Sequence, residues 1–308
     1  MNKIVTAMLV VCVLCGAFLA AFVSMGVSYA TPYLNVEVPS TGERIGCSED
    51  GTASVDVATG SMHWDRTWLS LSSLTSYDVE FGLHYLSSGP SNPLFGTARW
   101  CSIYDMKITY NVFPASLTLR TPRGTVIPFA NVGGTWYSTA SYGVYLSCAV
   151  YSAPLRFSLS DNCGNYVDFD LAGKPITFGD RLGRTISLTY NLAGNLRYVT
   201  DMWGRSIEFM YDGTPRVTAI RDVVAGTAYL TFTYTGGYLT NVRSGYASGA
   251  LFANFTFGYD GSNRLNSYTD PDGVATAFGY SGGGLANLAT DAATNTWGFT
   301  YNIGNTVF

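Results

Sequence analysis

Large apolar residues alternate with small or polar ones through the C-terminal half of the chain, in five-residue segments that each end in tyrosine. A period of two is typical of a β-strand with one buried face. Gly, Asn and Asp follow each tyrosine, and a second apolar pair comes after them, so we expect each unit to be a β-hairpin. The tyrosines are Tyr190, Tyr211, Tyr234, Tyr259, Tyr280 and Tyr301, at spacings of 21, 23, 25, 21 and 21 residues.

A second turn joins each unit to the next, and it begins with aspartate and has glycine at its fourth position. Aspartate there can accept a hydrogen bond from the backbone two residues on, and glycine tolerates the exit geometry. Two joints, at Asp222 and near residues 244–249, depart from this pattern, so we expect bulges or longer loops there. The pattern is clearest at Asp180 with Gly183, Asp201 with Gly204 and Asp270 with Gly273.

The same alternation, without a helical period, runs through residues 31–160. We therefore predict an all-β protein with an N-terminal antiparallel β domain over residues 31–160, packed on the first repeats. Residues 161–308 are expected to form tandem β-hairpin repeats. A lone hairpin is not stable in water, so neighbouring hairpins must pair into one continuous sheet. The last unit is expected to be incomplete, with an unpaired edge that invites pairing.

The spacing of Gly-Arg, the alternating apolar residues, Tyr and Asp-x-x-Gly in segments 180–191 and 201–213 resembles the YD repeat of the Rhs family. The resemblance covers about residues 161–308. It extends more weakly to residues 83–87 and 94–100, which resemble the domain that often precedes such repeats, with the usual Gly-Trp pair interrupted by Thr97-Ala98-Arg99.

The resemblance implies a spiralling β-sheet whose closed form is a hollow shell, commonly around a C-terminal toxin, at the cell surface or secreted. This chain has too few units for closure, so we expect a longer protein, further Rhs-like repeats or another envelope protein to complete it.

The N-terminus predicts export. Residues 4–23 carry no charged side chain, and Ser28-Tyr29-Ala30 precedes Thr31, which favours a signal peptide over residues 1–30, forming a signal helix, with cleavage after Ala30. The apolar run is long for a signal peptide, so an uncleaved membrane anchor over residues 4–23 stays open. Either way we expect a secreted, cell-surface or envelope protein.

The charge content excludes one class of partner and leaves the cysteines open. Charged residues make up 12% of the chain and the net charge is -4, with no basic run to neutralise phosphates, so nucleic acid is not an expected partner. In an exported chain, an even number of cysteines favours up to two disulfides, and buried free thiols are the alternative. The four cysteines beyond residue 30 are Cys47, Cys101, Cys148 and Cys163.

No residue pattern predicts catalysis, a cofactor or a metal. Ser281 matches the Gly-x-Ser-x-Gly pattern of hydrolases, but His63 and His84 both precede it and a glycine turn follows. Asp270 and Asp272 lack the rest of a calcium loop, and we expect them to form a turn.

We therefore expect a non-enzymatic surface scaffold. The alternative is an adhesin or carbohydrate-binding module, in which exposed aromatic residues would contact a glycan.

Overall fold

The computed structural model describes residues 43–48, 51–56, 59–71, 79–89, 91–139, 146–152, 155–226, 228–245, 253–291, 293–302 and 305–307. All of them belong to one compact unit, Pro32–Phe308. The predicted signal helix and the cleavage site after Ala30 lie outside the described residues. Among the residues described, no helix is long and apolar enough to span a membrane.

The prediction of an all-β protein is confirmed, since the described part of the chain contains β-strands and one 3₁₀ turn, η1 (Pro93–Phe95). Five strands form an inner sheet in which each strand pairs antiparallel with the next. These strands are β1 (Glu43–Ser48), β2 (Gly51–Asp56), β3 (Ser61–Leu71), β4 (Val79–Leu86) and β5 (Trp100–Ser102).

Nineteen further strands, β6 to β24, form one antiparallel meander in which each strand pairs with the one that follows it. This outer sheet runs without a break through residue 160, where we predicted a domain boundary; the boundary stays a prediction. Its first nine strands are β6 (Lys107–Asn111), β7 (Ser116–Arg120), β8 (Val126–Val132), β9 (Thr135–Ser138), β10 (Leu146–Ser152), β11 (Leu155–Asp161), β12 (Tyr166–Phe169), β13 (Pro175–Gly179) and β14 (Thr185–Tyr190).

Five of the six tyrosine-ended segments form strands of the outer sheet, and the second apolar pairs form the return strands; the last tyrosine-ended segment is divided between the outer sheet and a separate two-stranded sheet. The return strands are β15 (Leu196–Asp201), β17 (Val217–Asp222), β19 (Tyr238–Ser244), β21 (Leu265–Thr269) and β23 (Ala286–Thr290). The tyrosine-ended strands after β14 are β16 (Ser206–Tyr211), β18 (Ala228–Thr235), β20 (Ala253–Tyr259), β22 (Ala275–Tyr280) and β24 (Thr296–Gly298), which leads into β25 (Thr300–Asn302).

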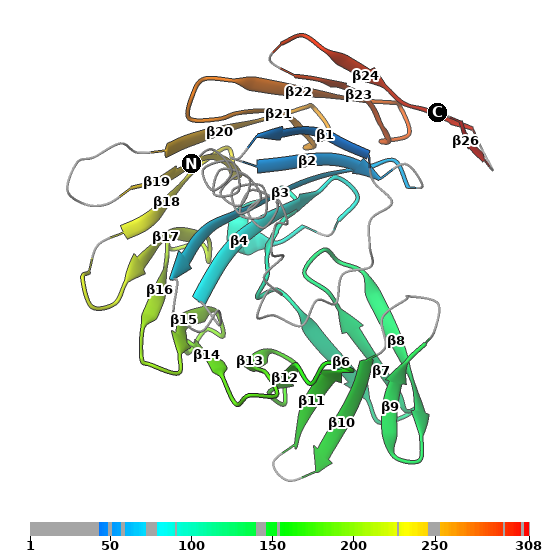
Figure 1. The fold of residues 1–308 in the computed structure, drawn as a ribbon, viewed down its shortest axis with the longest axis vertical. Coiled ribbons are helices and arrows are strands. Elements are labelled where there is room, and N and C mark those ends of the chain that lie inside the picture. The colour runs from blue at the N-terminus through cyan, green and yellow to red at the C-terminus, as the bar shows by residue number, and fades with distance from the viewer. Residues whose placement is uncertain are drawn as a thin grey trace, which may run out of the picture. The chain divides into compact units, whose positions relative to one another are not determined.

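The outer sheet curves around the inner sheet, whose strands β1 to β4 lie within the arc of β16 to β24 (Figure 1). The contact between the two sheets is a cluster of aromatic rings. Trp64 on β3 is fully buried, and its ring packs edge-on against Trp100 at 5.5 Å and Phe257 at 5.4 Å. Further along, Phe81 packs against Phe209 at 5.7 Å. The alternating apolar residues of the repeats therefore bury their faces against the N-terminal part of the same chain.

Polar contacts fix the register between the sheets. Trp100 Nε1 donates to the hydroxyl of Tyr259 at 2.7 Å, and the backbone N–H of Leu265 donates to the hydroxyl of Tyr85 at 2.9 Å. The backbone N–H of Ala286 donates to the carbonyl of Gly60 at 2.8 Å. The first two contacts join the β4–β5 pair to the hairpin that contains Tyr259 and Leu265, and the third joins the turn before β3 to the next hairpin, so a one-residue slip of the repeats would break all three.

The two irregular joints differ from the rest as far as they are described. The turn after Asp222 is one residue longer, because Gly226 N–H donates to the carbonyl of Asp222 at 2.9 Å, whereas Gly204 N–H reaches back only three residues, to Asp201. Residues 246–252 of the other joint lie outside the described residues. Bulges are more general than predicted, since the ladder slips by one residue at the tyrosine of several units, for example between Thr189 and Tyr190.

The last described strand, β26 (Asn305–Val307), pairs antiparallel with β25. The prediction that the final tyrosine-ended strand has an unpaired outer edge is therefore wrong for Thr300–Asn302, because the chain turns back and supplies the next pairing segment itself.

The upper limit of the predicted one or two disulfides is not reached, because two of the four cysteines that a pair of disulfides needs are free thiols. Cys148 is buried in β10, where burial raises the pKa of its thiol to about 12, and Cys163 is exposed in a turn. The alternative of a buried free thiol holds for Cys148. Cys101 is buried in β5 with its Sγ 3.5 Å from the carbonyl oxygen of His84, and the side chain of Cys47 lies outside the described residues.

Candidate functional site

The tyrosine that ends the first strand of each unit holds the preceding hairpin. Its hydroxyl donates to a backbone carbonyl at the start of the preceding return strand, and we call this contact the tyrosine clasp. Burial raises the pKa of Tyr190, Tyr211, Tyr234, Tyr259 and Tyr280, which keeps the donating proton in place. The clasps join Tyr190 to Pro175 (2.7 Å), Tyr211 to Leu196 (2.5 Å), Tyr234 to Val217 (2.6 Å), Tyr259 to Leu239 (2.7 Å), Tyr280 to Leu265 (2.7 Å) and Tyr301 to Ala286 (2.7 Å).

The aspartates of the joints organise the turns. Oδ1 of Asp201 accepts from the backbone N–H groups of Trp203 and Arg205, both at 2.9 Å, and Oδ2 accepts from Nε of Arg205 at 2.6 Å. We call this arrangement the aspartate clasp. The same contact between an aspartate Oδ2 and the arginine Nε four residues later recurs at Asp180 with Arg184 (2.7 Å), Asp212 with Arg216 (2.9 Å) and Asp260 with Arg264 (2.8 Å).

Glycine closes the joint turns because the backbone there is left-handed. Gly183, Gly204 and Gly273 have φ of 76°, 84° and 81°, and open space surrounds the position that a side chain would take. The requirement is therefore conformational and not one of close packing. At Asp270, which has no arginine four residues later, Oδ1 accepts from the backbone of Asp272 and Val274, as in an ordinary turn.

Two turns that follow tyrosines differ from the sequence interpretation. Glycine follows the aspartate in the turns after Tyr211 and Tyr259, but neither Gly213 nor Gly261 is in the left-handed region. After Tyr259, Asn263 takes that conformation with φ 65°. The reason is that Asp212 and Asp260 open longer, aspartate-clasped turns. The spacing of four residues to Arg216 and Arg264 was the signal for this in the sequence.

The ion pairs of these turns also depress acid pKa values. Burial opposes ionisation of Asp180, Asp212 and Asp260, but hydrogen bonds from the paired arginine and the turn backbone outweigh it, so their pKa values are lowered. The arginines then cover tyrosine rings. Arg216 lies 4.9 Å from the ring centre of Tyr234, and Arg264 lies 4.4 Å from that of Tyr280. The two kinds of clasp thus form one network along the rim of the sheet.

Both histidines lie on the inner sheet, next to a carboxylate that sequence reasoning did not connect with them. His84 Nδ1 lies 2.6 Å from Oδ1 of Asp65, and Arg123, from the turn between β7 and β8, pairs with the same oxygen at 3.1 Å. Burial opposes ionisation of Asp65, yet these partners lower its pKa. Burial and the charge of Arg123 lower the pKa of His63. The cluster ties the outer sheet to the inner one.

Ser281 lies in a turn after Tyr280, where its carbonyl accepts from Gly284 N–H at 2.9 Å. The two histidines are on β3 and β4 of the inner sheet. Among the residues described, no three His, Cys, Asp or Glu side chains are grouped to hold a metal ion.

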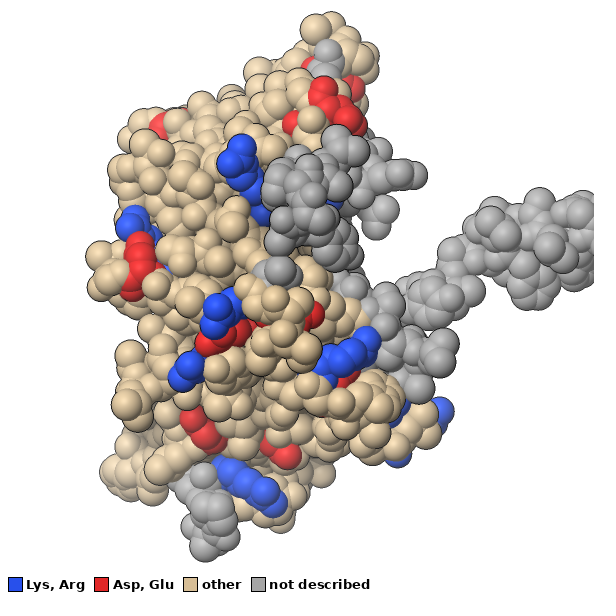
Figure 2. Space-filling model, turned by 90° about the vertical axis from the view of Figure 1, so that its left-hand side faces the viewer, with Lys and Arg blue, Asp and Glu red and all other residues tan. Residues whose placement is uncertain are grey.

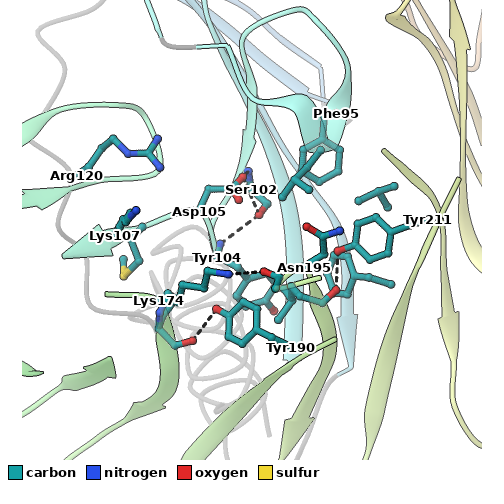
Figure 3. Close-up of a pocket in the computed structure, with 17 residues that line it drawn as sticks. Phe95, Ser102, Tyr104, Asp105, Lys107, Arg120, Lys174, Tyr190, Asn195 and Tyr211 are labelled. Carbon is teal, nitrogen blue, oxygen red and sulfur yellow. Dashed lines mark hydrogen bonds between the residues drawn. The ribbon is translucent and has the colours of Figure 1, made fainter. Parts of the chain in front are cut away.

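A pocket of about 150 Å³ opens where the loop after β5, the strands β6 and β7, and the first repeats meet. Figure 3 shows Lys107 and Arg120 on one side, and Tyr190, Asn195 and Tyr211 on the other. The chain has three lysines, and two of them, Lys107 and Lys174, line this pocket. No sequence motif indicated it, since its lining comes from segments far apart in the chain.

The acid of the pocket is Asp105. Its Oδ2 accepts from the backbone N–H of Ser102 at 2.6 Å, from the hydroxyl of Ser102 at 3.2 Å and from Nδ2 of Asn92 at 2.8 Å. Burial raises the pKa of Asp105 despite these hydrogen bonds. Lys174 lies on the far wall, where its Nζ donates to the carbonyl of Gly194 and stands 5.1 Å from the ring centre of Tyr190.

No protein-family model matches the chain, and no curated protein sequence is significantly similar to it. Solved structures of toxin complexes are distantly similar. The crystal structure of TcdB2-TccC3 without its hypervariable C-terminal region is 13% identical with a TM-score of 0.34, and the crystal structure of TcdB2-TccC3-Cdc42 is 14% identical with a TM-score of 0.35. A Photorhabdus luminescens Tc holotoxin pore is 14% identical with a TM-score of 0.33.

Each of these alignments covers 80% of this chain and 16% of the other, so the chain spans less than a fifth of the length of the structures that it matches.

Proposed function

We propose that the protein is a non-enzymatic, exported scaffold of the Rhs-like YD-repeat kind, which presents a rigid β surface outside the cell or in its envelope. The observation that carries the proposal is the use of the repeat's polar side chains. Tyr211, Asp201 and Arg205, and their counterparts in other units, are engaged in clasps that hold neighbouring strands together. Side chains committed to backbone contacts are not available for chemistry on a substrate.

The packing of the two sheets favours a scaffold that supports other parts of an assembly over a hollow shell that encloses a cargo. A hollow shell needs an empty concave face, whereas the inner sheet fills the concave face of these repeats with Trp64, Trp100 and Phe81. We infer that this chain contributes a filled, wall-like element to a larger shell or toxin-delivery assembly. Its partners in that assembly would be further repeats of the same kind or other envelope proteins.

The low charge of the surface supports the proposed location outside the cell or in its envelope. In the face shown in Figure 2, Lys and Arg lie in small groups, several of them beside Asp or Glu, within a largely uncharged surface. The aspartate clasps are examples of such neutralised pairs, as at Asp260 with Arg264. The described residues on this face form no extended basic stripe of the kind that captures nucleic acid electrostatically.

Cell fractionation tests the export that the proposal requires. The full chain is expressed with a C-terminal tag, intact cells are treated with proteinase K, and the medium is collected; a chain lacking residues 1–30 serves as the control. We expect the full chain in the medium or accessible to the protease, and the control inside the cell. Retention of both inside the cell would contradict the proposal. Sequencing the mature N-terminus separates cleavage after Ala30 from an anchor over residues 4–23.

A second candidate is a binding module on the same scaffold, either an adhesin or a carbohydrate-binding protein. The pocket beside Lys107 and Arg120 favours it, because it is the kind of concave, partly polar feature that binds ligands. The repeat tyrosines do not favour it. Their rings are packed against the core and their hydroxyls are used in clasps, so they are not free stacking platforms. A glycan array or an adhesion assay on whole cells separates this candidate from a purely structural one.

A further inference from the structure

The pocket between the inner sheet and the first repeats contains a pair of basic side chains whose arrangement needs an explanation. Lys107 on β6 and Arg120 on β7 are direct cross-strand partners. Like charges placed opposite each other on an antiparallel pair are destabilising. No hydrogen bond or close ion pair to another described residue holds either side chain, and the acid on which the charge of Arg120 acts is Asp105, whose ionised form it favours.

Several arginines of the repeats, by contrast, are paired with an acid. Arg184, Arg205, Arg216 and Arg264 each pair with an aspartate in their own turn, and Arg197 and Arg221 share Glu208. Those pairs neutralise the cation inside the protein. At Lys107 and Arg120 the same sequence places two cations together, and the nearest acid is Asp105, whose Oδ2 already accepts three hydrogen bonds.

We propose that this pocket binds a small oxyanion group, a carboxylate or a phosphate, between Lys107 and Arg120. The planar guanidinium offers paired N–H donors that match two oxygens of such a group, and the lysine adds a compact positive charge. An anion between the two side chains would turn their repulsion into two attractive contacts.

The remaining walls fit an anionic end group of modest size. The pocket measures about 150 Å³, below the roughly 300 Å³ at which drug-sized ligand sites begin. It therefore accommodates a head group or a single small molecule. Lys174 adds a third positive charge on the far wall, held by Gly194 and Tyr190. The carboxyl of Asp105 is held by Ser102 and Asn92, so it is already occupied by hydrogen bonds from its own segment.

Two sources of the oxyanion share this chemistry: the carboxylate of an acidic sugar, and free inorganic phosphate. The pocket's apolar wall, with Phe95, Tyr104 and Phe209, accommodates a sugar ring as well as a bare ion. The inference stands independently of the scaffold proposal, because it requires the pocket and not the site of export.

Titration calorimetry on the purified mature chain tests the inference, with D-glucuronate and inorganic phosphate as probes, D-glucose as the neutral sugar, and ionic strength held constant with chloride. We expect at least one anion to bind at millimolar concentration and glucose not to bind. Binding of glucuronate alone identifies an acidic sugar as the ligand type, and binding of phosphate alone identifies the free ion.

Matched variants locate the site. Lys107→Gln and Arg120→Gln should each weaken binding by about tenfold, because each removes one charge-assisted contact. Arg243→Gln, at an exposed arginine on β19 outside the pocket, should leave it unchanged. Circular dichroism and thermal melting confirm that each variant is folded. Absence of binding by both anions, or binding that both pocket variants leave unchanged, would overturn the inference.

Discussion

In the outer sheet, neighbouring strands are held by contacts that span a few residues or one hairpin, as between Asp201 and Arg205 or between Tyr211 and Leu196. In the inner sheet, buried rings contact residues more than 150 positions away, as between Trp64 and Phe257. The outer sheet therefore repeats one local set of contacts, whereas the rings of the inner sheet share distant partners, as Trp64 and Trp100 share Phe257. We expect damage to an outer-sheet clasp to stay local and damage to the inner sheet to affect the whole molecule.

The largest expected effect comes from removing the central ring of the contact between the sheets. Trp64→Ala should destabilise the protein by about 3–5 kcal/mol, because it leaves a cavity where a fully buried ring touched Trp100, Phe257 and Tyr268. Urea unfolding measures the loss. Trp203→Ala, at a half-exposed tryptophan in an outer turn, should change stability by less than about 0.5 kcal/mol. Equal losses in the two variants would refute the contrast between the sheets.

A smaller effect is expected from opening one aspartate clasp. Asp201→Ala removes the acceptor of two backbone N–H groups and of Arg205 Nε, at a carboxylate with no exposed surface. We expect a loss of about 2 kcal/mol. Hydrogen exchange should accelerate at Trp203 and Arg205 but not in distant repeats. Asp272→Ala, at an exposed turn position, is the control and should have no measurable effect. Faster exchange across the whole sheet would show that the clasp is not local.

The smallest expected effect is on the pH dependence of stability. It differs between the acid of the pocket and the aspartates of the repeats. Asp105 has a raised pKa in the folded protein, so its charge costs stability as the pH rises above 3.8, the ordinary value. Asp105→Asn keeps an acceptor for Ser102 and removes that cost. We expect Tm to rise by about 2 °C at pH 7, consistent with about 1 kcal/mol for a chain of this size, and to change little below pH 3.8.

The clasp aspartates change stability with pH in the opposite direction. The pKa values of Asp180, Asp212 and Asp260 are lowered on folding, so the stability that they contribute is present above pH 3.8 and is lost as the pH falls through their folded pKa values. Acid should therefore weaken the repeats of both the native chain and Asp105→Asn. A gain from Asp105→Asn that is largest in acid would contradict this assignment.

The repeats could be predicted from the sequence because their structure is local. Alternation at period two, a tyrosine every 21 to 25 residues and turn residues between them specify hairpins without reference to the rest of the chain. The aspartate at each joint forms its contacts within four residues, as Asp180 does with Leu182 and Arg184. What the pattern did not reveal was the arginine that completes the clasp.

The inner sheet and the pocket could not be predicted in the same way. Nothing in the pattern around Trp100 indicates that its indole reaches Tyr259, or that Tyr85 reaches Leu265, because such contacts depend on how the whole sheet curves. The pocket is a further step removed, since Lys107 and Lys174 come together only when the first repeats dock on the loop after β5. The composition did show that lysine is rare in this chain, so the presence of two lysines in one pocket is informative.

The tyrosine clasp also makes the length of a unit variable. The hydroxyl of Tyr280 bonds a carbonyl 15 residues back, that of Tyr234 one 17 residues back and that of Tyr259 one 20 residues back, yet each reaches the start of the preceding return strand. The additional residues are therefore accommodated at the joint turns, which lie between the bonded carbonyl and the tyrosine. Such joints are sites at which peptide segments could be grafted, or lost and gained during evolution by duplication, while every strand keeps its register.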